Sequence, residues 1–373
     1  MAELQLAVID VKPGAALESQ SGLQMLRPRI YGAFMAPTGP KKVACIVMHP
    51  TSNFMGHYLI APLAARGICC MGLNSRYAGN DTVLLMERAI QDLGAGVKYL
   101  RGHGYEKIFL VGNSGGAALA SFYQAQAEKL TATHFADGDP THLHPADLPP
   151  VDGIALCAAH LGRSRLLREW IDPSVTDEHD PLSLDAELDM YDPRRRVPYD
   201  ADFLARFSAA QKARLDRIEH WALERLAMLR STPGAPRDQS FIVYRTHADP
   251  RCVDLTLDRN DRAPGSVWGD ARTVNYSCNA MGRTTSLTAF LSQWSSRSQA
   301  DGPSNLARTS VPLLLLTYTA DQSTFPSTRD AWLAAGGERI RNVDIVGGNH
   351  YLAGQPELVP QAAEAIAQWA HAL

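Results

Sequence analysis

Continuous apolar runs recur along most of the chain and are separated by stretches of mixed polarity. Short runs without polar interruption are typical of strands buried on both faces of a parallel sheet. On this pattern we predict strands over 4–11, 29–36, 43–48, 68–73, 107–111, 151–159, 311–318 and 341–346. Patterns with helical character predict helices over 59–65, 80–101, 202–229, 328–335 and 356–372, and another directly after strand 107–111. This alternation predicts the α/β class, with a mostly parallel central sheet flanked by helices.

Two local features refine these ranges. A connection containing Gly and Ser joins the first two strands, and we expect these strands to form an antiparallel hairpin at the sheet edge. Asn80, Asp81 and Thr82 carry the side chains that cap helices, so we expect the helix that ends near Arg101 to begin there.

The regular alternation stops between Arg163 and Arg308, where prolines punctuate a charged region. We interpret residues 163–308 as a largely helical cap, inserted between the core segments 1–162 and 309–373. Arg194, Arg195 and Arg196 in this region are candidates for binding an anionic substrate, but a solvated charged face is the favoured interpretation.

Composition narrows the function classes. The 373 residues are 45% hydrophobic and 20% charged, and the formal net charge is −3, so nothing electrostatic favours nucleic acid or an anionic membrane as partner. The N-terminal residues lack the pattern of a signal peptide, and no apolar stretch reaches the length of a bilayer span. Most of the six cysteines lie in apolar runs, and no zinc-binding motif occurs. We expect a cytoplasmic protein without a metal or a cofactor.

One stretch carries a chemical signature. The apolar run 107–111 leads into Gly112-Asn113-Ser114-Gly115-Gly116, which fits the Gly-x-Ser-x-Gly pattern of a nucleophile elbow. Such a turn strains the serine and brings a strand against a helix, so Gly112 and Gly116 stand where side chains would collide. A dinucleotide-binding turn is the alternative, but Asn113-Ser114 replaces the second glycine of its Gly-x-Gly-x-x-Gly fingerprint.

Two further strand ends supply a base and an acid. Asp321 follows strand 311–318, and His350 follows strand 341–346. The carboxyl ends of parallel strands share one edge, so Ser114, Asp321 and His350 are predicted to converge as nucleophile, acid and base. Asp344, within the last strand, and Asp330, in a predicted helix, are weaker candidates for the acid.

These residues resemble the serine esterases of the α/β-hydrolase fold. The resemblance spans roughly 29–160 and 309–373 and leaves the cap uncovered. It rests on these segments: 49–51, 112–116, 312–321 and 347–350.

The resemblance also implies an oxyanion hole. In the family a His-Gly-x segment follows a central strand, and the backbone N–H of x is one donor. Here the segment is His49-Pro50-Thr51, so Thr51 is the expected first donor, with Ser52 as the alternative, and Gly115 supplies the second. His49 is expected to have a structural role at its strand end.

The remaining site candidates are His57, His160, Trp268 and Tyr276, which together with Ser52 are expected to line the substrate pocket. The leading hypothesis is hydrolysis of a carboxylic ester of a small to medium organic substrate through an acyl-enzyme. Amide, thioester, lactone and carbon–carbon bond hydrolases share such a triad and remain alternatives. A ligand-binding protein without turnover and a nicotinamide-dependent oxidoreductase rank lower. Monomer and homodimer are both compatible with the sequence.

Overall fold

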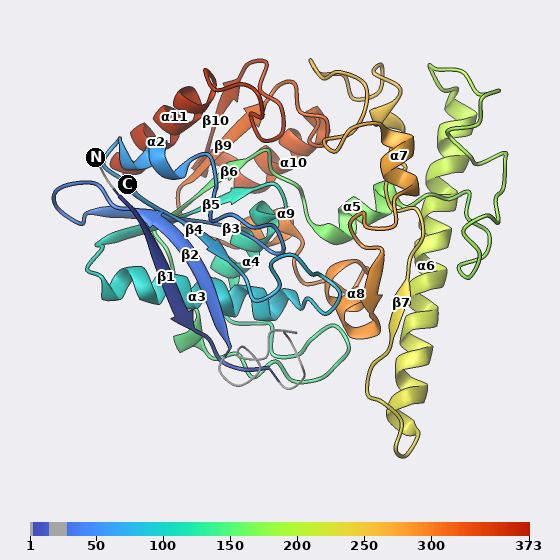
Figure 1. Ribbon diagram of the computed structural model, residues 1–373, viewed down its shortest axis with the longest axis horizontal. Helices are drawn as coiled ribbons and strands as arrows, with labels where there is room; N and C mark the ends of the chain where they lie inside the picture. The colour runs from blue at the N-terminus through green and yellow to red at the C-terminus, as the bar shows by residue number, and fades with distance from the viewer. Residues whose placement is uncertain (1–2, 15–27) are drawn as a thin grey trace.

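An eight-stranded sheet forms the centre of this computed structural model, which describes residues 3–14 and 28–373 (Figure 1). Its strand order is β1-β2-β4-β3-β5-β6-β9-β10. The strands are β1 (Leu4–Asp10), β2 (Arg29–Met35), β3 (Val43–His49), β4 (Cys69–Asn74), β5 (Lys107–Asn113), β6 (Gly153–Cys157), β9 (Leu313–Tyr318) and β10 (Ile340–Ile345). The two pairings made by β2 are antiparallel and the other five are parallel. All eight predicted strands and the mostly parallel sheet are therefore confirmed.

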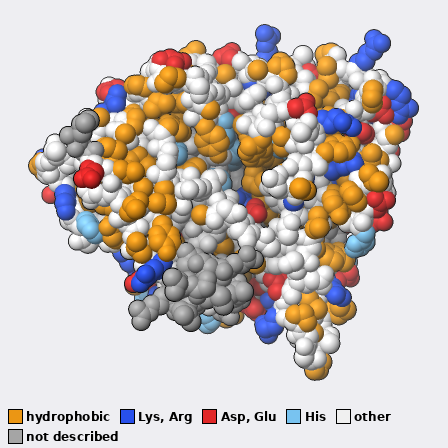
Figure 2. All heavy atoms as spheres, in the orientation of Figure 1, with side chains coloured by type: hydrophobic (Ala, Val, Ile, Leu, Met, Phe, Trp, Pro, Cys, Tyr) orange, Lys and Arg blue, Asp and Glu red, His pale blue; other side chains and the backbone are white. Residues whose placement is uncertain are grey.

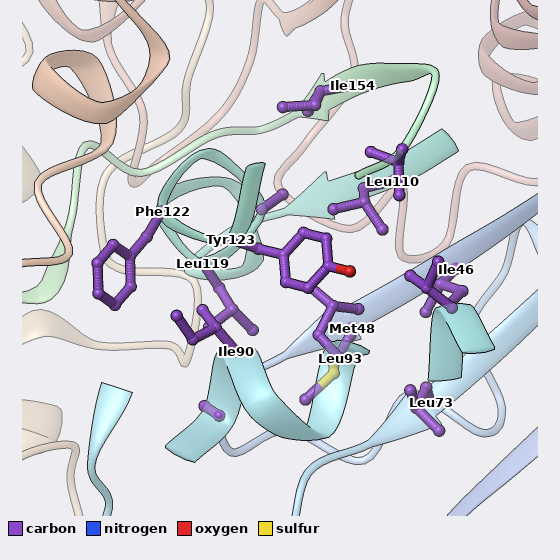
Figure 3. Packing of buried hydrophobic residues seen from close by; sticks show 14 of the residues in the cluster. Ile46, Met48, Leu73, Ile90, Leu93, Leu110, Leu119, Phe122, Tyr123 and Ile154 are labelled. Atoms are coloured by element: carbon purple, nitrogen blue, oxygen red, sulfur yellow. The ribbon is translucent and has the colours of Figure 1, made fainter. Parts of the chain in front are cut away.

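Helices cover both faces of this sheet because its central strands are apolar on both sides. In β3, Ile46 and Met48 belong to the apolar cluster on one face, whereas Cys45 and Val47 belong to the cluster on the other. Figure 3 shows the first cluster, with Leu93 and Phe122 among the helical residues that pack there. Its helices are α3 (Met86–Gly102), α4 (Gly116–Glu128), α9 (Gly302–Leu306) and α10 (Pro326–Gly336). The opposite face carries α2 (Ile60–Ala64) and α11 (Val359–His371).

The predicted hairpin at the sheet edge is confirmed, since β1 is an edge strand and pairs antiparallel with β2. Most of the connection that was expected to contain Gly and Ser lies outside the described residues, in 15–27.

The predicted start of α3 is wrong. Asn80 Oδ1 accepts a hydrogen bond from the Thr82 N–H at 3.0 Å, which closes a local turn rather than opening the helix. The helix begins at Met86, whose N–H donates at 2.9 Å to Ser292 Oγ of α8 (Leu287–Gln293). A distant segment therefore supplies the cap that the local sequence was expected to provide.

The segment predicted to be a cap lies beside the sheet, on the right of Figure 1, except near its end. It contains α5 (Arg163–Trp170), α6 (Ala201–Ser231), α7 (Ala271–Tyr276) and α8, together with a small antiparallel sheet of β7 (Ser240–Ile242) and β8 (Thr284–Ser286). Apolar residues of α5, α6 and α8 form a separate buried cluster. By contrast, α9 contacts α4 and α10 of the core.

The arginine triplet at 194–196 makes structural contacts. Arg194 pairs with the neighbouring Asp192, and Arg195 lies over the ring of Phe203. These contacts agree with the favoured interpretation of a charged surface. No helix within residues 3–14 and 28–373 is long and apolar enough to cross a membrane.

Candidate active site

A strained turn between β5 and α4 presents Ser114. Its φ of 57° lies in the left-handed region, which non-glycine residues rarely adopt. A Cβ on Gly112 would lie 2.5 Å from Ala117 Cα, and one on Gly116 would lie 2.3 Å from the Met48 carbonyl oxygen. The two glycines are therefore required for the close approach of helix and strands, as the motif predicted.

The structure brings Ser114, Asp321 and His350 together from the ends of β5, β9 and β10. His350 Nε2 lies 2.9 Å from Ser114 Oγ, and His350 Nδ1 lies 2.8 Å from Asp321 Oδ2. All three residues are buried, and Asp321 is inaccessible to solvent. This arrangement allows Ser114 to donate its proton to Nε2 while the carboxylate holds the Nδ1 proton.

Asp321 is held ionised by its neighbours. Burial alone would raise the pKa of Asp321, but the His350 ring and the hydrogen bond from Thr324 outweigh it, and the pKa lies below its ordinary value. The backbone N–H groups of Ser323 and Thr324 also donate to Oδ1 at 2.7 and 3.1 Å. The carboxylate is therefore both fixed in place and charged.

The other acid candidates lie away from this group. Asp344 sits in β10, where it accepts a hydrogen bond from Asn342 at 2.8 Å. Asp330 is exposed on α10 and pairs with Arg329 at 2.9 Å.

A cavity of about 570 Å³ opens above Ser114 and His350. Figure 2 shows a hollow between the sheet part and the part that carries α6, with histidine side chains within it. The predicted pocket residues Thr51, Ser52, His160 and Trp268 line the cavity.

Two predicted pocket residues are not among the described residues that line it. His57 donates from Nε2 to Asn113 Oδ1 at 2.9 Å and stacks on Tyr58, so it contacts the residue that directly precedes the nucleophile rather than the cavity. Tyr276 lies under the guanidinium groups of Arg245 and Arg272, whose centres are 4.2 and 4.8 Å from its ring.

The loop after β3 departs from the expected oxyanion geometry. The N–H groups of Thr51 and Ser52 both donate to His49 Nδ1, at 3.1 and 2.9 Å. The geometry does not support the prediction that one of them is the first oxyanion donor, because the imidazole already engages both. Gly115, the expected second donor, lies at the N-terminus of α4, directly after the nucleophile.

Some residues at the site were not identified from the sequence. Tyr351 lines the cavity, and burial raises the pKa of its hydroxyl, an effect that the neighbouring Ser114 opposes. Ser323 Oγ lies 3.0 Å from His160 Nε2. The Arg163 guanidinium is buried and donates to Thr51 Oγ1 at 2.7 Å and to Asp81 Oδ2 at 3.0 Å. Of these residues, only Tyr351 could have been identified from the sequence, because it directly follows His350.

No protein-family model matches this sequence, and no curated protein sequence does. Solved structures are similar in shape across nearly the whole chain. A structure described as DcsB in complex with its substrate analogue aligns with a TM-score of 0.52 at 13% identity, covering 98% of this chain and 99% of that one. The esterase domain of a Rhodothermus marinus protein aligns at 0.48 and 12% identity, covering 99% and 98%. A thermostable carboxyl esterase from Bacillus coagulans aligns at 0.48 and 13% identity, also covering 99% and 98%.

These likenesses concern the fold. The sheet and its flanking helices have the arrangement of the α/β-hydrolase fold, so the expected fold class is confirmed. What the chain does has to be argued from its own residues.

Proposed function

We propose that this α/β-hydrolase-fold chain is a serine hydrolase that cleaves a carboxylic ester through an acyl-enzyme. The observation that carries the proposal is the continuous relay in which Ser114 Oγ lies 2.9 Å from His350 Nε2 and His350 Nδ1 lies 2.8 Å from Asp321. A serine hydroxyl is a weak nucleophile until a base takes its proton, and the relay supplies that base.

The proposed reaction has two halves. Ser114 Oγ attacks the carbonyl carbon as its proton passes to His350 Nε2, and His350 then gives this proton to the departing alcohol. A water molecule repeats the sequence on the acyl-enzyme and releases the acid. Asp321 keeps the imidazole in the tautomer whose Nε2 is free to accept, and it stabilises the imidazolium that forms.

The segment 163–308 is proposed to act as a cap that shapes the substrate pocket. Trp268, Val274 and Met281 of this segment line the cavity, as do Asn80 and Asp81 from the core. An apolar wall that faces polar groups suits a small to medium organic ester. Hydrolysis rates for p-nitrophenyl esters of increasing chain length would measure the size accepted.

A fluorophosphonate probe tests the proposal directly. Wild-type protein should be labelled covalently, and Ser114→Ala should not be, while both keep the same circular dichroism spectrum. Folded wild-type protein that resists the probe and hydrolyses no ester would refute the proposal and favour a ligand-binding role.

A further inference from the structure

His49, at the end of β3, has its ring orientation set by the loop that follows. Its Nδ1 accepts the N–H groups of Thr51 and Ser52, at 3.1 and 2.9 Å. A ring nitrogen that accepts hydrogen bonds carries no proton, so the proton of the neutral ring resides on Nε2. Burial, reinforced by nearby Arg163, holds the pKa of His49 well below its ordinary value, so the ring stays neutral.

The protonated nitrogen of His49 faces the reaction site. Nε2 lies 2.7 Å from the position that a Cβ on Gly115 would occupy, directly beside the residue after the nucleophile. His49 and Ser114 line the same cavity. Among the described residues, no group accepts a hydrogen bond from Nε2. Nε2 is also not one of the fully buried polar atoms that lack a partner. A free N–H donor therefore borders the space above Ser114.

The loop itself offers no such donor. Pro50 has no N–H, and the next two N–H groups are turned toward the imidazole. An ester carbonyl attacked by Ser114 develops negative charge on its oxygen, and this charge requires hydrogen-bond donors in fixed positions.

We propose that the His49 Nε2–H and the Gly115 N–H together form the oxyanion hole. The N–H groups of Thr51 and Ser52 then act indirectly, because they fix the orientation of the His49 ring. When Ser114 Oγ adds to the carbonyl carbon, the C=O electron pair moves to the oxygen, which accepts both hydrogen bonds. No proton leaves His49, and the pair returns when the alcohol departs. This inference rests on the proposed ester hydrolysis.

Two substitutions at His49 separate a catalytic role from a role in loop structure. Asparagine places a carboxamide oxygen near the position of Nδ1, so His49→Asn keeps an acceptor for the loop and loses the donor. Glutamine places an amide N–H near the position of Nε2, so His49→Gln keeps the donor and loses the loop acceptor.

The expected result is a fall in kcat of about 10²- to 10³-fold for His49→Asn, with KM nearly unchanged, because the lost interaction exists only in the transition state. His49→Gln should keep kcat within about tenfold of wild type, in line with a retained donor. The opposite order, or equal losses in both variants, would overturn the inference. A Tyr351→Phe variant that lost as much as expected for His49→Asn, while His49→Asn stayed active, would assign the donor to Tyr351 instead.

A crystal structure of wild-type protein phosphonylated at Ser114 gives a test that needs no variant. The phosphoryl oxygen mimics the oxyanion and should lie within about 3.2 Å of both His49 Nε2 and Gly115 N. An oxygen bonded to Thr51 N or to the Tyr351 hydroxyl would refute the role of His49 and leave ester hydrolysis intact. Protein that is not phosphonylated at all would refute ester hydrolysis itself.

Discussion

Substitution of Asp321 by asparagine tests the proposed relay most sharply, because the neighbours of the carboxylate dictate how the amide must sit. Oδ1 accepts the N–H groups of Ser323 and Thr324, at 2.7 and 3.1 Å, so this position has to remain an oxygen. The amide nitrogen must then occupy the Oδ2 position, which lies 2.8 Å from His350 Nδ1. An amide N–H there meets the N–H of the imidazole.

His350 Nδ1 also lies 3.0 Å from Oδ1, but its shorter contact is the 2.8 Å one with the Oδ2 position, and there the conflict is relieved when the imidazole moves its proton. If Nδ1 accepts from the amide, the proton resides on Nε2, and the ring can no longer accept the proton of Ser114. The substitution also removes the negative charge that stabilises the imidazolium. We expect kcat to fall about 10⁴-fold, equivalent to about 5 kcal/mol in the barrier.

The measurement is steady-state hydrolysis of a p-nitrophenyl ester, with the folded fraction checked by thermal melting. Asp344→Asn is the matched control, because Asp344 lies on β10 and contacts Asn342 rather than the site, and it should retain wild-type activity. An Asp321→Asn protein that kept a tenth or more of wild-type kcat would show that Asp321 does not hold the base, and the reasoning would fail.

Three other predictions concern packing, the pocket and pH. Gly116→Ala should lower the free energy of unfolding by about 3 kcal/mol or more in urea titrations, because its Cβ would lie 2.3 Å from a backbone oxygen of β3; an unchanged midpoint would contradict this close packing. Trp268→Ala should raise KM for long-chain esters about tenfold more than KM for acetate esters, because Trp268 lines the cavity. Tyr276→Ala should leave both KM values unchanged. If Trp268→Ala raised KM equally for long-chain and acetate esters, the acyl chain would have to bind elsewhere. Burial lowers the pKa of His57 to about 4 and of His160 to about 3, so the unfolded chain binds more protons below about pH 6.5 and stability should decline as pH falls. Each of the two histidines should lower the free energy of unfolding by about 2 kcal/mol at pH 5 relative to pH 7, and His57→Gln should abolish the contribution of His57. Equal free energies of unfolding at the two pH values in the wild-type protein would refute this.

The order of strands along the chain could be predicted because buried parallel strands are continuous apolar runs, and those runs are visible in the sequence. The same property predicted where Ser114, Asp321 and His350 meet, since each follows such a run and the ends of parallel strands share one edge. Their catalytic roles remain a prediction until the kinetic tests are made.

Contacts between distant segments were beyond this reasoning. The start of α3 depends on the hydrogen bond from Met86 to Ser292, more than two hundred positions further along the chain, and no pattern near Met86 predicts this contact. That His57 does not line the cavity also depends on a contact between distant segments, because its ring is hydrogen-bonded to Asn113 of β5.

The sequence by itself determined which chemical groups stand at the strand ends and in what order, because residue type and apolar periodicity are local properties. The tertiary structure decided how those groups point. It turned the N–H groups of Thr51 and Ser52 onto His49 and left the His49 Nε2 proton facing the cavity beside Gly115. Hydrogen-bond direction depends on the three-dimensional path of the backbone, and for that reason the donors expected from the sequence and the donor proposed from the structure differ.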